Sequence, residues 1–145
     1  MRAPRPPAYY KSPKLRELVT TMEVVGVSPV TRNGAGLRRS GYRAWLEVLR
    51  AAAGEAAGRR VREDVDLFSV RMELRLHDPM DQGSDLDNYV KPIQDAMAEQ
   101  GVFGPTAHVG SSMKGDERVD HLEVCRKRVV GQDEAGVHVE VWSLV

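Results

Sequence analysis

Apolar and polar side chains alternate most regularly between residues 70 and 77. The apolar positions are Val70, Met72, Leu74 and Leu76, and the polar positions between them are Arg71, Glu73, Arg75 and His77. A period of two predicts a β-strand with one buried face. Residues 20–27 are rich in β-branched side chains, and residues 119–130 and 137–144 have similar strand character. We therefore predict four strands.

Two further segments carry apolar residues at helical spacing. In the first, residues 40–57, Ser40 is a suitable N-cap, and the apolar positions are Tyr42, Trp45, Leu46, Leu49 and Ala53. In the second, Val90, Ile93 and Met97 fall on one side of the predicted helix. Its other side carries Asn88, Lys91 and Asp95. Both segments are predicted to be amphipathic helices.

The boundaries of the second helix follow from its flanking residues. Asp87 or Asn88 is a suitable N-cap, and Gly101 a suitable end. Pro92 lies slightly deep for a first-turn proline and disfavours the α conformation at Lys91, so an irregular first turn is expected.

The order strand, helix, strand, helix, strand, strand predicts an α+β fold. We expect a single domain with a mixed or largely antiparallel sheet of about four strands and two helices packed on it. The chain has 145 residues, 41% of them hydrophobic, which suits one domain with its own core. Residues 1–19, which are basic and rich in proline, are predicted to be a mobile arm, and residues 20–145 the domain.

The zero net charge conceals an asymmetry along the chain. Residues 1–60 carry 12 Lys/Arg and 4 Asp/Glu, a balance of +8, and residues 61–145 carry 9 and 17, a balance of −8. A basic first part that contacts phosphates and an acidic second part that binds cations would suit a metal-dependent nucleic-acid enzyme. Two solvated faces that pair with each other would give the same pattern.

The single cysteine, Cys125, excludes an intrachain disulfide and a cysteine-rich zinc motif. A reducing compartment is therefore expected. The chain has no signal-peptide pattern and no long apolar run. These features predict a cytoplasmic protein without a membrane partner.

Candidate chemistry concentrates around the start of the second helix. Asp85 and Asp87 are two residues apart and can face the same way in extended backbone, and hard cations such as Mg²⁺ prefer oxygen ligands. Lys91 lies about one helical turn after Asn88, and Asp95 one turn further on. Asp95 would either hold Lys91 in place or act as a further ligand. A metal and a lysine so placed suit phosphodiester chemistry.

Spacing alone leaves other interpretations open. A capped helix with a solvated acidic first turn has the same pattern. A calcium loop fits poorly, because Tyr89 occupies the next alternate ligand position. A zinc site also fits poorly, because the four histidines have no ligand spacing.

The segment from Asp85 to Phe103, DLDNYVKPIQDAMAEQGVF, resembles the RusA family of Holliday junction resolvases. The matched positions are Asp85, Asp87, Asn88, Lys91 and Asp95. The likeness is strong for residues 84–103 and loose over the rest of residues 20–145. It implies an endodeoxyribonuclease of DNA recombination and repair that binds Mg²⁺ or Mn²⁺. It also implies a homodimer whose two sites nick opposed strands of a four-way junction.

The resemblance assigns Asp85 and Asp87 as metal ligands and Lys91 as the catalytic lysine. The family's last aspartate normally follows the helix closely, but here that place holds Gly104, Pro105 and Thr106. We interpret residues 104–115 as carrying an insertion and Asp116 as the displaced catalytic metal ligand. Asp120 is the second candidate.

The basic residues before and within the first helix are the predicted DNA contacts: Arg32, Arg38, Arg39 and Arg43. Arg43 would alternatively pair with Glu47, four residues on. Two other functions stay open. One is a non-catalytic protein that binds branched DNA and has lost a competent third carboxylate. The other is a metal-dependent transferase, against which the short chain counts.

Overall fold

The computed structural model describes residues 14–31, 39–61, 65, 67–77, 86–104 and 118–144, without the side chains of Arg39 and Ser40. The elements in chain order are β1 (Leu15–Val25), α1 (Arg39–Gly58), β2 (Phe68–Leu76), α2 (Leu86–Glu99), β3 (Val119–Arg128), the short 3₁₀ turn η5 (Gln132–Glu134) and β4 (Gly136–Leu144).

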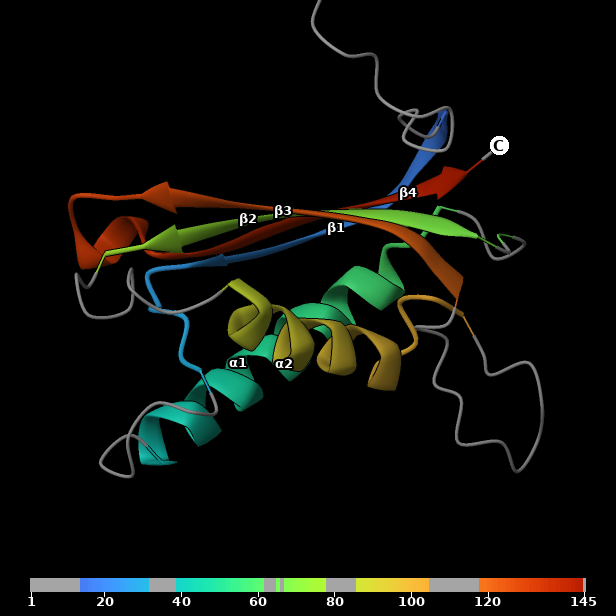
Figure 1. The fold of residues 1–145 in the computed structure, drawn as a ribbon. Helices are drawn as coiled ribbons and strands as arrows, with labels where there is room; N and C mark the ends of the chain where they lie inside the picture. The colour runs from blue at the N-terminus through green and yellow to red at the C-terminus, as the bar shows by residue number, and fades with distance from the viewer. Residues whose placement is uncertain are drawn as a thin grey trace, which may run out of the picture.

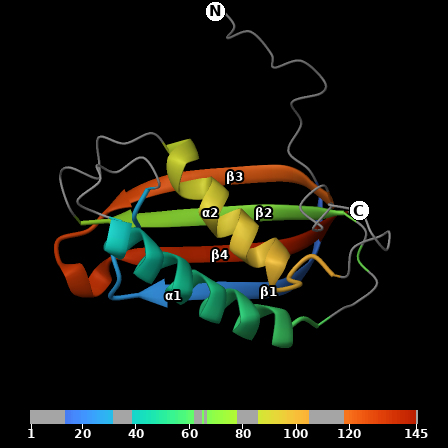
Figure 2. The same ribbon diagram turned by 90° about the horizontal axis from the view of Figure 1, so that it is seen from below.

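The four strands form one sheet in the order β1-β4-β2-β3, and both helices cover the same face of it (Figures 1 and 2). β4 is antiparallel to both β1 and β2, whereas β2 and β3 are parallel. The mixed sheet and the two helices confirm the predicted α+β fold. The order of elements along the chain is also as predicted. Within the described residues, no helix is both long and apolar enough to span a membrane.

The first strand begins at Leu15, earlier than the predicted start at residue 20. Leu15 pairs with Leu144, and the backbone N–H of Glu17 donates to Ser143 Oγ at 3.1 Å. Residues 15–19, predicted to be part of the arm, therefore lie in the sheet. Backbone pairing with β4 holds them there and does not require the β-branched side chains on which the prediction depended.

The core lies between the helices and the sheet, and the predicted apolar stripes supply it. From α1, Trp45, Leu49 and Ala53 are fully buried, and from α2, Ile93 and Met97. The sheet contributes its alternate residues, among them Val70, Met72, Leu74, Val137, Val139 and Val141. The period-two pattern of residues 70–77 is confirmed, because its apolar positions are buried and its polar positions half-buried.

The end of α2 is fixed by a glycine, as predicted. Gly101 has a φ of +83°. Its N–H donates to the carbonyl of Ala98 at 3.2 Å, and the N–H of Val102 donates to the carbonyl of Met97 at 3.0 Å. This pair of hydrogen bonds is the Schellman motif, with buried Val102 and Met97 as its apolar contact. The predicted irregular first turn was wrong, since α2 continues through Pro92, whose ring is buried. Burial of the ring offsets part of the cost of the missing proline N–H.

The sheet face away from the helices carries charged side chains. Arg75 lies between two glutamates, with Nε 2.9 Å from Glu73 and Nη1 2.7 Å from Glu23. His138 also contacts Glu23. The hydrogen bond from Arg75 is the main cause that lowers the pKa of Glu73 below its ordinary value of 4.5, and the positive charges of Lys127 and His138 act in the same direction.

This network predicts a specific acid dependence of stability. Because the pKa of Glu73 is lower in the folded chain, its contribution is present above pH 4.5 and is lost as the pH falls through the lowered value. In Glu73→Gln, the free energy of unfolding should therefore fall less steeply on acidification than in the wild type. At pH 7 the variant should be less stable by less than about 1 kcal/mol. Urea denaturation at neutral pH and at a pH about one unit below the ordinary pKa of glutamate measures these free energies of unfolding. Glu47→Gln, at an exposed glutamate of α1, is the control, and equal slopes for both variants would refute the assignment.

Candidate functional site

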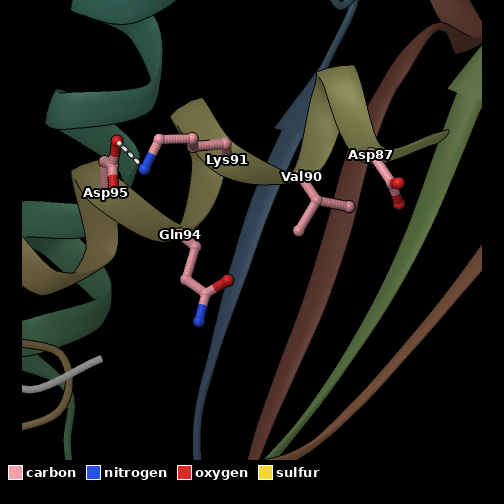
Figure 3. Close-up of a pocket in the computed structure, with 5 residues that line it drawn as sticks. All are labelled: Asp87, Val90, Lys91, Gln94 and Asp95. Atoms are coloured by element: carbon pink, nitrogen blue, oxygen red, sulfur yellow. Dashed lines mark ion pairs between the residues drawn. The ribbon is translucent and has the colours of Figure 1, made fainter. Parts of the chain in front are cut away.

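One side of α2 lines an open pocket of about 250 Å³ (Figure 3). The pocket is lined by Asp87, Val90, Lys91, Gln94 and Asp95. These positions are separated by three or four residues, which places them on one side of a helix. The opposite side is buried in the core, so packing of Ile93 and Met97 fixes the direction in which the stripe points.

Lys91 and Asp95 are paired, with Lys91 Nζ 3.6 Å from Asp95 Oδ2. In Figure 3 the Lys91 side chain extends toward Asp95 and away from Asp87. Asp95 was predicted either to hold Lys91 in place or to act as a further metal ligand. The ion pair in the structure is the contact that the first of these roles requires. The side chains are 78% and 40% exposed, and exposed pairs of this kind contribute less than about 1 kcal/mol. Lys91 can therefore exchange Asp95 for a phosphate oxygen at low cost.

Asp87 lies in the first turn of α2 with an exposed side chain. The helix begins at Leu86, so the prediction that Asp87 or Asn88 is its N-cap was wrong. A carboxylate in this turn interacts favourably with the positive end of the helix dipole. Asp87 lines the pocket, and its carboxylate suits a hydrated Mg²⁺, which usually keeps several of its waters. Asn88 is half-buried and does not line the pocket.

Several predicted site residues lie outside the described part of the chain: Asp85, Asp116, Arg32 and Arg38. Arg39 is the first residue of α1, but its side chain is also outside. Of the three predicted metal ligands, the structure thus describes Asp87. Among the described residues, no group of three or more His, Cys, Asp or Glu side chains could hold a metal ion. Asp87 can supply one metal ligand. A complete metal site would also need carboxylates from residues outside the described part of the chain.

Asp120, the second candidate for the third carboxylate, does not lie near Asp87 within one chain. Its neighbour Val119 pairs with Phe68 at the start of β2, and Arg118 Nη1 donates to the carbonyl of Phe103 at 3.2 Å. β3 therefore starts at the carboxyl end of α2, whose 14 residues span about 20 Å. This separation arises because the parallel strands β2 and β3 must start at the same end of the sheet. Asp120 cannot complete the Asp87 site of its own chain.

The two helices start at the same end of the sheet, where β1, β2 and β3 finish (Figure 2). Arg43 is exposed in the first turns of α1, and Asp87 is exposed in the first turn of α2. The helix starts that carry one predicted DNA contact and one predicted metal ligand thus lie at one end of the sheet (Figure 2).

Three basic residues at this end, Arg126, Lys127 and Arg128, finish β3 and were not predicted as site residues from the sequence. Their signal was a run of three consecutive cations. It was missed because the segment was interpreted as a strand from its composition, and the positions of its charges were not considered separately.

The structure is thus an α+β domain that carries a carboxylate and a lysine on one side of α2, near the start of the helix. Comparisons with protein-family models, curated proteins and solved structures found no match. The resemblance to the RusA family, strong for residues 84–103 and loose over the rest of residues 20–145, therefore stays a prediction from the sequence.

Proposed function

We propose that the chain is a metal-dependent endodeoxyribonuclease of the RusA type that resolves Holliday junctions in DNA recombination and repair. The observation that carries this proposal is the stripe of Asp87, Lys91 and Asp95 on α2, which presents a carboxylate, the ligand type that Mg²⁺ prefers, and a cation at one pocket. The same helix buries the apolar residues of the motif. The polar positions of this stripe are thus available to a ligand, as catalysis on an extended phosphodiester requires.

Each residue has a defined role in this proposal. Asp87 binds Mg²⁺ or Mn²⁺ together with Asp85 and Asp116. When bound, the metal activates water and offsets phosphate charge. Lys91 moves from Asp95 to a non-bridging phosphate oxygen and stabilises the negative charge that develops there. Asp95 holds Lys91 in place in the absence of DNA.

The DNA is held by phosphate contacts at the end of the molecule where both helices start. Arg43 supplies one such contact, and Arg32, Arg38 and Arg39 precede it in the sequence. Four-way junctions have two strands to be cut, so a homodimer with two sites would be the working unit. A nuclease of this kind would work in the cytoplasm, the reducing compartment that the single Cys125 favours.

A second candidate function is a non-catalytic protein that binds branched DNA. It is favoured by the location of Asp120 at the far end of α2 from Asp87. Such a protein would bind four-way junctions and leave them intact. A single assay therefore separates the two functions.

The assay incubates the purified chain with a labelled synthetic four-way junction in Mg²⁺, in Mn²⁺ and in excess chelator. We expect paired, symmetrical nicks with either metal and none with chelator. Binding should weaken as salt rises, because phosphate contacts release counterions. Binding without nicks in both metals would favour the second function, and neither binding nor nicks would refute both.

A further inference from the structure

The helix-facing side of β3 changes from apolar to cationic along the strand. Val124 packs against the core, and the next two side chains on this side are Arg126 and Arg128. Their partners in β2, Leu74 and Leu76, are buried under the helices. Because paired residues of neighbouring strands point to the same face of a sheet, both arginines point toward the helical layer. Arg126 is half-buried there, and Arg128 is exposed.

β3 brings these arginines to the start of α2. The strand begins at the carboxyl end of this helix, because Arg118 Nη1 donates to the carbonyl of Phe103 at 3.2 Å. From Arg118 to Arg126 the extended chain covers about 26 Å, whereas the 14 residues of α2 cover about 20 Å. The two elements are in contact, and the first turn of α2 lies over the second half of β3 (Figure 2). Arg126 therefore reaches the level of the turn that carries Asp87, and Arg128 lies just beyond it.

The two arginines suit an extended polyanion. Residues two apart on a strand are separated by about 6.6 Å, which allows the pair to contact neighbouring phosphates of one nucleic-acid strand. A guanidinium group also matches phosphate oxygens with two parallel hydrogen bonds. Among the described residues, no ion pair involves Arg128, so its charge is available to a ligand. Together with Lys91 of α2, the arginines give the start of this helix cations from two elements.

We propose that Arg126 and Arg128 bind neighbouring phosphates of the DNA strand held at the Asp87 site. This inference rests on the proposed nuclease function and adds two substrate-binding residues to it. Lys127, between the arginines in the sequence, has no part in this contact. Its partner in β2 is Arg75, which belongs to the charged network on the opposite face of the sheet.

Binding of a labelled four-way junction in excess chelator tests the contact without depending on cleavage. Arg128→Gln should weaken binding about tenfold and reduce the slope of log affinity against log salt by about one, since one phosphate contact is lost. Arg128→Lys keeps the charge without the planar fork and should have an intermediate affinity.

Lys127→Gln is the matched control, because it removes the same charge from the adjacent position of the same strand. It should change the affinity by less than about twofold and leave the salt slope unchanged. Both side chains are exposed, so urea denaturation should find both variants as stable as the wild type.

A second arm locates the contact on the DNA. Each junction carries one neutral methylphosphonate, placed in turn at the phosphates that flank the branch point. At one position the wild type and Lys127→Gln should both lose affinity. Arg128→Gln should lose nothing further there, because it already lacks the contact with that phosphate.

The outcomes separate this inference from the nuclease function. Equal losses of affinity in Arg128→Gln and Lys127→Gln, at every methylphosphonate position, would overturn the arginine contact and leave the nuclease function standing. Binding without cleavage would contradict the nuclease function, and a loss confined to Arg128→Gln would still support the contact. A wild type that does not bind the junction would overturn both.

Discussion

Asp87→Asn is expected to reduce metal-dependent cleavage of a four-way junction by at least about a hundredfold, because Asp87 is a charged metal ligand at the reacting phosphate in the proposed nuclease. The side chain is exposed in the first turn of α2 and makes no contribution to the core. Junction affinity in the absence of metal should therefore stay within about twofold of the wild type. Single-turnover cleavage and gel-shift binding measure the two quantities.

A matched control for Asp87→Asn is Asp133→Asn, at an aspartate of η5 on another element. Both variants lose one negative charge, so a general charge effect would change both alike. Cleavage by Asp87→Asn at a rate near that of the wild type would exclude Asp87 as a metal ligand. Loss of binding together with cleavage would indicate that Asp87 positions the DNA instead.

Gly136→Ala is expected to lower the free energy of unfolding by about 3 kcal/mol or more. Gly136 has a φ of +149°, a conformation that side chains rarely adopt, and it starts β4. A Cβ added there would lie 1.8 Å from the carbonyl oxygen of Val24 and 2.7 Å from its carbonyl carbon. Neither atom can move without separating β1 from β4, because both belong to the backbone of a paired strand. Urea denaturation followed by circular dichroism measures the loss.

Gly41→Ala provides the comparison for this effect. Gly41 lies in α1, and no heavy atom lies within 4 Å of a Cβ added there. Because alanine favours helix and restricts the unfolded chain, this change should stabilise the fold by up to about 1 kcal/mol. Opposite signs for the same substitution would establish that the surroundings of Gly136 cause the loss. A Gly136→Ala variant within about 1 kcal/mol of the wild type would contradict the close approach of β1 and β4.

Local patterns in the sequence were sufficient to predict the type and order of the elements. The alternation of Val70 to Leu76 and the stripe of Ile93 and Met97 are properties of single elements, and each matches its buried face. The pairing of Lys91 with Asp95 is also local, since four residues separate them on one helix. The start of β1 at Leu15 was missed because it depends on pairing with Leu144, a residue distant in the sequence.

The relations between elements were not accessible from these patterns. The place of β4 between β1 and β2, and the parallel pairing of β2 with β3, are set by tertiary packing. For that reason Asp120 appeared to be a suitable partner for Asp87, whereas the topology places it at the other end of α2. Likewise, Arg43 and Asp87 reach the same end only because both helices start there.

The covering of β1 has a consequence for how this sheet meets other molecules. The carbonyls of Val19 and Thr21 on β1 accept hydrogen bonds from Val61 and Arg59 of the same chain, and two register shifts interrupt the strand. A strand from another molecule therefore finds no regular row of free backbone groups there, and the edge of β1 is protected against the edge-to-edge association that leads to aggregation.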